Sequence, residues 1–86
     1  MADHHYIEVA LVAPEGVVLK GKFMALSAIN DGGQFDILPQ HANLISKIKE
    51  KIWLRVDRTH VQEITLNHGI LMCRNNKVDV FVGLVT

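Results

Sequence analysis

The chain has 86 residues, of which 49% are hydrophobic and 21% are charged, and its nine basic and nine acidic residues cancel. That length suits one domain with a modest core, and the net charge does not support binding of nucleic acid or of an anionic membrane surface. No apolar run approaches the ~20 residues that span a bilayer, and no signal segment opens the chain. Cys73 is the single cysteine, which excludes an intramolecular disulfide and suits a reducing compartment. We therefore expect a cytosolic protein, and its attachment to a membrane complex through a partner stays open.

The chain opens with β-forming runs divided by turn signals. Residues 6–13, YIEVALVA, are rich in β-forming side chains, and PEG at 14–16 predicts a turn, because proline presets the first turn dihedral and glycine accepts a positive one. The next runs, VVLKG and FMALSAI, predict two strands that separate at Gly21 and Lys22. NDGG at 30–33 then ends the pattern.

Residues 40–51, QHANLISKIKEK, give a different signal. Leu44, Ile45 and Ile48 are spaced as on one face of a helix. We expect one or two helical turns in this segment.

Two alternating segments, 51–57 and 61–67, predict a β-hairpin. A two-residue turn would set a core leucine opposite a glutamate, whereas an odd-length loop over 58–60 keeps the apolar side chains of both strands on one face. Because a one-residue slip would turn all of those side chains outward, we expect the odd loop. The resulting pairs are Leu54 with Ile64, Ile52 with Leu66 and, on the polar face, Arg55 with Glu63.

The last hairpin carries its own turn signal, Asn75 and Asn76. Asparagine tolerates the left-handed conformation that both central positions of a type I′ turn require. The register set by this turn places Ile70 opposite Phe81 on the outer face, so both faces of the sheet require cover. On the inner face it pairs Cys73 with Val78 and Leu71 with Val80, followed by Val82. Short strands at regular spacing, roughly six to ten of them, predict an all-β antiparallel sandwich or barrel.

Asp36 and His41 are the first candidates for chemistry. A carboxylate that orients an imidazole is a catalytic device, but it requires a third member, and no Ser or Cys stands nearby in a nucleophile-elbow pattern. We favour a solvated or capping role for Asp36 and a turn-capping or partner-binding role for His41.

Metal and phosphate sites are disfavoured as well. The histidines lack the close, regular spacing of zinc ligands. NDGGQ at 30–34 is neither a dinucleotide fingerprint nor a P-loop, because no lysine follows to hold phosphate. The five histidines are His4, His5, His41, His60 and His68.

Cys73 and Trp53 have simpler interpretations. Cys73 is predicted to face inward and to behave as a small hydrophobe. Trp53 lies on the face opposite Leu54, where it belongs either to a second core layer or to a partner contact.

Three motifs in order carry a resemblance to a known family. The first is PEG at 14–16 with Gly21, and the last is GIL at 69–71, followed by Val78 and Val80. The central motif, G-xxx-I-x-P-x-H-A-x-L, comprises Gly33, Ile37, Pro39, His41, Ala42 and Leu44. From about Tyr6 to Val82 the chain resembles the N-terminal β-sandwich domain of the epsilon subunit of F-type ATP synthases.

The resemblance implies a flattened antiparallel β-sandwich of about ten short strands. It also implies a non-catalytic rotor subunit, without cofactor or metal, in the central stalk of a proton- or sodium-translocating synthase. The implied partners are the gamma subunit and the membrane ring, with no nucleic acid and no insertion into the membrane. The implied location is peripheral, at the cytoplasmic face of the cell membrane. The ring-facing loop would be Asn30, Asp31, Gly32, Gly33, Gln34 and Phe35, and the gamma-facing segment His41, Ala42 and Leu44.

The chain departs from the family pattern in two respects. Asp36 and Gln40 stand where the family usually has glycines, which removes backbone freedom. Typical members continue into a C-terminal helical hairpin that restrains ATP hydrolysis, and we expect this chain, one domain over residues 1–86, to lack it. If Thr86 is the natural end, inhibition by this subunit is absent or delegated elsewhere; if the sequence is part of a longer one, no such conclusion holds.

Two other functions remain as alternatives. One is a free-standing β-sandwich that binds a small ligand, with Asp36 and His41 at the mouth of a pocket. The weaker one is a hydrolase centred on the same two residues.

Overall fold

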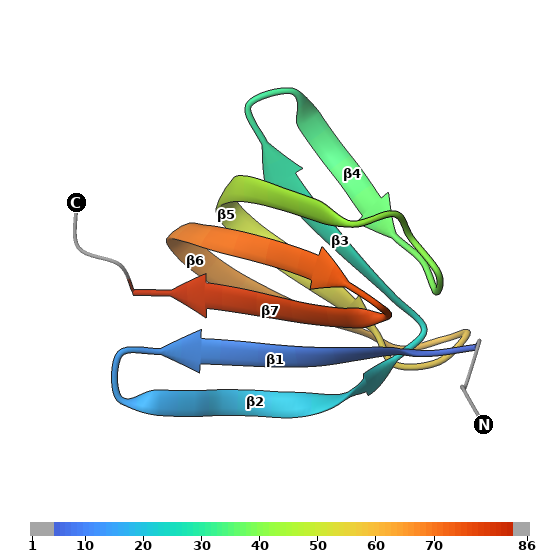
Figure 1. The fold of residues 1–86 in the computed structure, drawn as a ribbon. Coiled ribbons are helices and arrows are strands. Elements are labelled where there is room, and N and C mark those ends of the chain that lie inside the picture. The colour runs from blue at the N-terminus through green and yellow to red at the C-terminus, as the bar shows by residue number, and fades with distance from the viewer. Residues whose placement is uncertain (1–4, 84–86) are drawn as a thin grey trace.

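The computed structural model describes residues 5–83, which fold into seven β-strands (Figure 1). The strands are β1 (Ile7–Ala13), β2 (Gly16–Phe23), β3 (Ala25–Asn30), β4 (Gly33–Ile37), β5 (Leu44–Arg55), β6 (Val61–Arg74) and β7 (Lys77–Val82). The prediction of an all-β fold is confirmed. The described residues include no helix long and apolar enough to cross a membrane.

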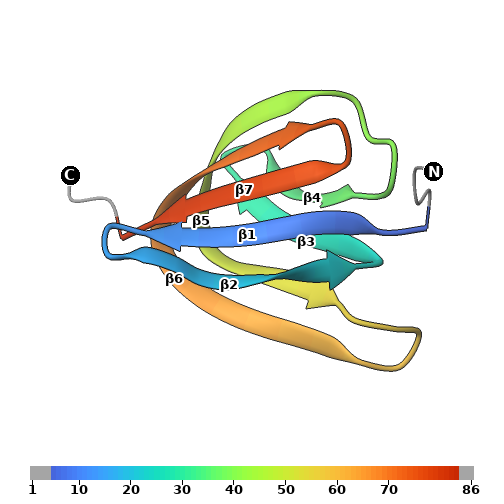
Figure 2. The same cartoon turned by 60° about the horizontal axis from the view of Figure 1, so that its bottom comes forward.

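A single sheet in the order β2-β1-β7-β6-β5-β3-β4 curls over on itself to form two layers (Figures 1 and 2). The first layer comprises β2, β1, β7, residues 69–74 of β6 and residues 44–49 of β5. The second layer comprises residues 61–65 of β6, residues 51–55 of β5, β3 and β4. The long, bent strands β5 and β6 belong to both layers, which is why the structure has fewer and longer strands than expected.

One pair of strands departs from the antiparallel arrangement expected of the whole sheet. β1 and β7 run parallel, with Val9 opposite Val78 and Leu11 opposite Val80, whereas every other pair is antiparallel. A tight turn can join only antiparallel neighbours. Because β1 and β7 come from opposite ends of the described chain, no such turn fixes their direction.

The core lies between the two layers and consists of the side chains that alternate inward along each strand. No polar or charged residue within the described chain is buried, so any chemistry or recognition takes place at the surface. The buried core residues are Ile7, Val9, Leu11, Phe23, Leu26, Ala28, Ile37, Ile48, Ile52, Leu54, Leu66, Leu71, Cys73, Val78 and Val80.

Three of the predicted turns are confirmed. Pro14 and Glu15 connect β1 to β2, and Asp31 and Gly32 connect β3 to β4. At the last turn both asparagines adopt positive φ, 52° and 62°, and the predicted register of the β6–β7 hairpin is observed. Its pairs are Cys73 with Val78, Leu71 with Val80, Ile70 with Phe81, and Gly69 with Val82.

The helical turns predicted within residues 40–51 are wrong, because Leu44 begins β5 and pairs with β6. Leu44 and Ile48 pack inward, whereas Ile45 points outward and is 69% exposed. The spacing resembles a helical stripe because β5 carries apolar residues on both of its faces. The break expected at Gly21 and Lys22 is also wrong, since β2 continues through both residues to Phe23.

The β5–β6 hairpin has the predicted parity but a different register. Its loop covers residues 56–60, an odd number, and the strands are shifted by two residues from the predicted pairing. Asp57 Oδ1 accepts hydrogen bonds from the backbone N–H groups of Thr59 and His60, both at 2.9 Å, which closes the longer loop. The observed pairs are Ile52 with Ile64, Trp53 with Glu63, and Leu54 with Gln62.

Candidate docking surfaces

The hairpin tip between β3 and β4 contains the residues implied to face the ring. Asn30 Oδ1 accepts a hydrogen bond from the backbone N–H of Gly32 at 2.8 Å, and the Asn30 amide donates to Ser46 Oγ at 3.3 Å. Gly33 has a φ of 117°, which favours glycine. The tip is therefore a turn of fixed conformation, and it lies at one extremity of the molecule (Figure 1).

The side chains around this tip differ in exposure. Asp31 is 99% exposed, with Oδ1 at 3.4 Å from Lys49 Nζ. Gln34 is exposed, whereas Phe35 is half-buried and packs against the core. The part of the tip that a partner could contact is thus small, polar and convex.

Residues 38–43, which contain His41 and Ala42 of the segment implied to face gamma, lie at the other end of β4. The His41 N–H donates to the Leu38 carbonyl at 3.1 Å, and Gln40 adopts a φ of 67°. The backbone N–H of Gln40 donates to Asn76 Oδ1, which ties this segment to the β6–β7 turn.

The three implied gamma-facing residues do not share one environment. His41 is half-buried, with Nδ1 at 2.7 Å from the Ala42 carbonyl oxygen, and Ala42 is exposed. Leu44 lies opposite Cys73 and packs partly against the core. His41 and Ala42 are therefore available to a partner, while Leu44 mainly contributes to packing.

Asp36 and His41 are not brought together. Asp36 Oδ1 accepts a hydrogen bond from Ser27 Oγ at 2.6 Å on the outer surface of the second layer. Within residues 5–83 no hydrogen bond joins Asp36 to His41, and no three His, Cys, Asp or Glu side chains are placed to hold a metal. His4, weighed above as a ligand, lies outside the described residues.

The outer face of the second layer is polar, and its polar groups bond to one another. Trp53 Nε1 donates to Glu63 Oε1 at 2.9 Å, and Lys51 Nζ lies 3.6 Å from Glu63 Oε2 and 6.0 Å from the Trp53 ring centroid. A shallow hollow beside Trp53 is lined in part by Ser27 and Gln34. Trp53 is partly exposed in this surface network, so it does not form a second core layer within the described chain.

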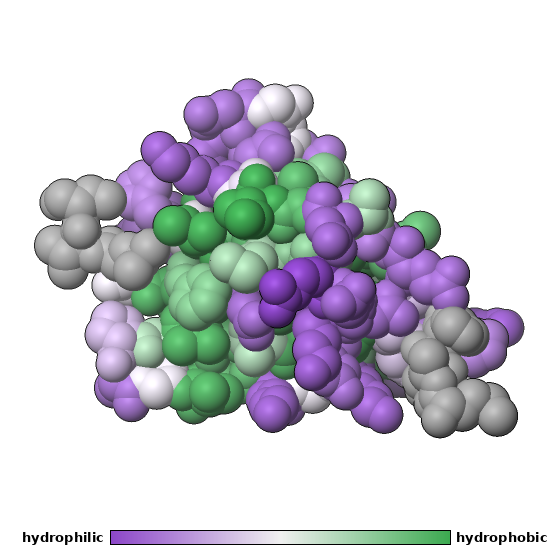
Figure 3. Space-filling model, in the orientation of Figure 1, coloured by the Kyte–Doolittle hydropathy of each residue, from purple (hydrophilic) through white to green (hydrophobic). Residues whose placement is uncertain are grey.

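The outer face of the first layer is apolar over much of its area. Val12, Phe81 and Ile70 lie side by side across β1, β7 and β6. All three side chains are partly exposed, and hydrophobic side chains gather on this face in Figure 3. Contiguous exposed apolar surface of this kind marks an interaction site. We define the apolar patch as Val12, Val17, Ile45, Ile70, Met72 and Phe81.

The loop of residues 56–60 holds a carboxylate–imidazole pair that was not predicted. His60 Nδ1 lies 2.8 Å from Asp57 Oδ1. The backbone N–H of Thr59, followed by the His60 side chain, lowers the pKa of Asp57 from 3.8 to about 2. An aspartate that bonds the backbone two residues on is a known turn signal. The Thr59 hydroxyl lies 3.1 Å from Asp57 Oδ1 and 3.0 Å from the same His60 Nδ1, so the three side chains together organise an exposed turn. By contrast, burial raises the pKa of Cys73, which makes it a poor nucleophile.

A family model described as the ATP synthase, Delta/Epsilon chain, beta-sandwich domain matches residues 6–85. Two curated relatives are named ATP synthase epsilon chain. The protein from a Nitratiruptor species is 26% identical over 77 residues, and that from Sulfurimonas denitrificans is 22% identical over 77 residues. Each match covers 88% of this chain, but only 60% and 59% of the respective relatives. The chain thus spans about three-fifths of the length of these relatives.

Solved structures share the fold at low identity. A chain from the cryo-EM structure of Euglena gracilis mitochondrial ATP synthase, OSCP/F1/c-ring, superposes with a TM-score of 0.87 at 11% identity, over 100% of this chain and 56% of that chain. A chain from the Tetrahymena thermophila mitochondrial ATP synthase central stalk/c-ring gives 0.73 at 15% identity, over 87% and 61%. These likenesses show the fold alone, whereas the family model covers nearly the whole sequence. This chain belongs to the family of ATP synthase delta/epsilon chain β-sandwich domains.

Proposed function

We propose that this domain is a non-catalytic component of the central stalk of an F-type ATP synthase. In this role it packs on the gamma subunit and couples it to the membrane ring. The curated relatives are named ATP synthase epsilon chain, and the titles of the structural neighbours name a c-ring and, in one case, a central stalk, which supports this role. The complex would hold it peripherally at the cytoplasmic face of the cell membrane.

The apolar patch is the observation that carries this proposal. An enzyme would place converging polar groups in a concave site, but neither hollow described for this surface is lined by Asp36 or His41. In the second layer the polar groups hydrogen-bond to one another, whereas the first layer leaves Phe81 and Ile70 partly exposed beside the exposed side chains of Val17 and Ile45. A surface of this kind suits a permanent subunit contact.

The positions of residues 38–43 and of the β3–β4 hairpin tip support two further contacts with the partners. Residues 38–43 border the first layer through the bond from Gln40 to Asn76, so His41 and Ala42 would extend the gamma contact. The β3–β4 hairpin tip, residues 30–35, lies toward the opposite end of β4 from His41 and would meet the ring.

Calorimetric titration of this chain into the gamma subunit from the same genome tests the proposal. We expect one-to-one, sub-micromolar binding, weakened at least tenfold by Phe81→Ser because that variant removes an aromatic anchor. Val61→Ser is the matched control, since Val61 is 46% exposed on the opposite layer. If the folded wild-type chain produced no binding heat, or if both variants behaved alike, the proposed contact would be wrong.

A further inference from the structure

Charge is unevenly distributed along the outer face of the first layer. Three cross-strand rows can be followed from β2 to β6 and, in part, to β5. The row next to the β6–β7 turn contains Lys22, Glu8, Lys77 and Arg74. The next row contains Lys20, Ala10, Asp79, Met72 and Ile45. The third row contains Val17, Val12, Phe81, Ile70 and Lys47.

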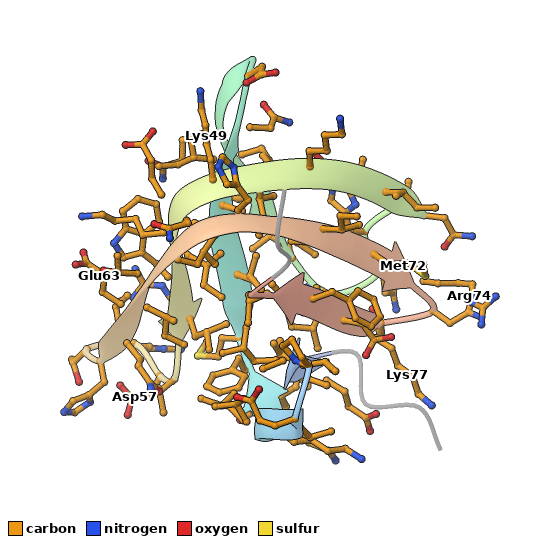
Figure 4. All side chains as sticks on the ribbon, turned by 90° about the vertical axis from the view of Figure 1, so that its left-hand side faces the viewer. Lys49, Asp57, Glu63, Met72, Arg74 and Lys77 are labelled. Carbon is orange, nitrogen blue, oxygen red and sulfur yellow. The ribbon has the colours of Figure 1, made fainter. Side chains whose placement is uncertain are left out.

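This face therefore has a basic end and an apolar end. We define the basic end as Lys20, Lys22, Arg74 and Lys77. In Figure 3 hydrophilic residues occupy the right of this face, and in Figure 4 Arg74 and Lys77 project on the side opposite Glu63 and Asp57. Two carboxylates, Glu8 and Asp79, lie among the four cations, so the end keeps a net positive charge.

The charges of the basic end are not used inside the chain. Within residues 5–83, neither the four cations nor Glu8 and Asp79 form an ion pair. Lys49, at the end of the first-layer part of β5, pairs with Asp31, and Lys51 of the second layer pairs with Glu63. The basic end thus presents four cations whose counter-charges must come from solvent or from a partner.

A shallow hollow lies where the two ends meet. Its lining includes Val12 and Val17 from the apolar end, and Lys20 and Lys77 together with the carboxylates Glu8 and Asp79 from the basic end. An acidic side chain flanked by apolar neighbours would place its carboxylate near the lysines and its alkyl part against the valines. The hollow therefore favours a partner whose acidic and apolar groups alternate across the same boundary.

We propose that the basic end selects and orients the stalk partner by meeting carboxylates on that partner, beside an apolar ridge that covers the apolar patch. This inference rests on the proposed function, because it specifies the chemistry of the surface that docks on the first layer. Glu8 and Asp79 limit the positions that partner carboxylates can occupy, which fixes one orientation. Complementary charge also speeds association and makes it depend on ionic strength.

The gamma subunit from the same genome serves as the probe, by stopped-flow and calorimetry at several salt concentrations. The double variant Lys20→Glu, Lys77→Glu should reduce the association rate about tenfold or more at low salt, with a weaker salt dependence than wild type. Lys20→Gln, Lys77→Gln should fall between the two. Arg58→Glu is the control, because it makes a same-sign charge reversal in the loop of residues 56–60, on an exposed side chain outside the first layer.

The outcomes separate the two proposals. The oriented contact is supported if both lysine double variants associate more slowly than wild type, melt like wild type, and Arg58→Glu associates at the wild-type rate. The role of the basic end is overturned if the lysine double variants associate with rates and salt dependence within twofold of Arg58→Glu while Phe81→Ser still weakens binding. The stalk function is left intact by that result. A wild-type chain that does not bind gamma at all overturns the stalk function, and this inference with it.

Discussion

Gly69 shows how a single residue controls the contact between β5, β6 and β7. A Cβ at this position would lie 2.9 Å from the Phe81 carbonyl oxygen and 3.4 Å from Ile48 Cγ1. The first neighbour is backbone and cannot move without disturbing the β6–β7 ladder. The glycine of the GIL motif is therefore required for close packing, directly beneath the apolar patch.

We expect Gly69→Ala to lower the free energy of unfolding by about 1–3 kcal/mol, because overpacking forces the backbone to shift. Urea denaturation followed by circular dichroism measures this change. Gly21→Ala is the control, since a Cβ there would make only an ordinary van der Waals contact with the Phe23 ring, at 3.4 Å. Equal stability of the two variants would contradict the close approach seen at Gly69.

Asn76 holds neighbouring elements together through hydrogen bonds. Its carbonyl accepts from the Glu8 N–H at 2.8 Å, and its side chain accepts from the Gln40 N–H. One turn residue therefore joins β1, the β6–β7 hairpin and residues 38–43. Glu8 lies in the cross-strand row next to the β6–β7 turn, together with Lys22, Lys77 and Arg74. Asn76 therefore also links the His41 segment to the basic end.

At the scale of the element, the loop of residues 56–60 sets the register of the β5–β6 hairpin through the Asp57 carboxylate. The pKa of Asp57 is about 2 in the folded state against an ordinary 3.8, because the Thr59 N–H and the His60 side chain favour the charged form. A depressed pKa means that the carboxylate stabilises the fold above pH 3.8, and that this contribution is lost as the pH falls toward 2.

We expect the stability difference between wild type and Asp57→Asn to be present at neutral pH and to disappear between about pH 4 and pH 2. Thermal melts across this range measure the difference, and carbon-13 NMR of the carboxyl group gives the pKa directly. Asp31→Asn is the control, because Asp31 is fully exposed at a hairpin tip. A difference that stayed constant down to pH 2 would show that the charge of Asp57 does not support the loop.

The elements that could be predicted are those fixed by local signals. The two asparagines determine the β6–β7 register, and with it the apolar pair of Ile70 and Phe81 on the outer face. The prediction for β5 is wrong because Ile45 belongs to that same outer face, and because a bulge interrupts its pairing with β6. Glu50, at a φ of 70°, lies in this bulge opposite Leu66 and Asn67. Because the residue in the bulge is a glutamate and not a glycine, the sequence gives no signal that the strand bends there.

The basic end could not be found from the sequence for a different reason. Arg74 and Lys77 meet at the β6–β7 turn, but Lys20 and Lys22 of β2 join them only because β1 pairs with β7 in parallel. No turn or periodicity encodes that pairing. Part of the apolar patch was predicted, because Ile70 and Phe81 face each other within a single hairpin. A surface that spans the whole sheet can be predicted only when the order of the strands is known.

At the scale of the whole molecule, the two proposed contacts lie at separate places. The hairpin tip at Asp31 and the segment at His41 are at opposite ends of β4; the tip contacts Ser46 and Lys49 of β5, whereas the His41 segment is bonded to the β6–β7 turn. A rotor component needs this separation, because it must hold the stalk on one surface and the ring on another. The core between them, with no buried polar group among the described residues, provides a rigid connection.

A substitution that weakens one of the two contacts should therefore leave the other unchanged. His41→Ala should weaken gamma binding by about 1–2 kcal/mol through a lost interface hydrogen bond, with near wild-type stability and unchanged retention of the pre-formed complex on vesicles that contain the purified ring. Asp31→Lys should leave the gamma titration within twofold of wild type and reduce retention on the ring, because it reverses a charge at the exposed tip and, away from the tip, removes only the surface ion pair with Lys49. Calorimetry and vesicle co-sedimentation provide the two measurements. If either variant impaired both, a single continuous contact would replace the two proposed here, and the hairpin tip would have to be reassigned to the gamma surface.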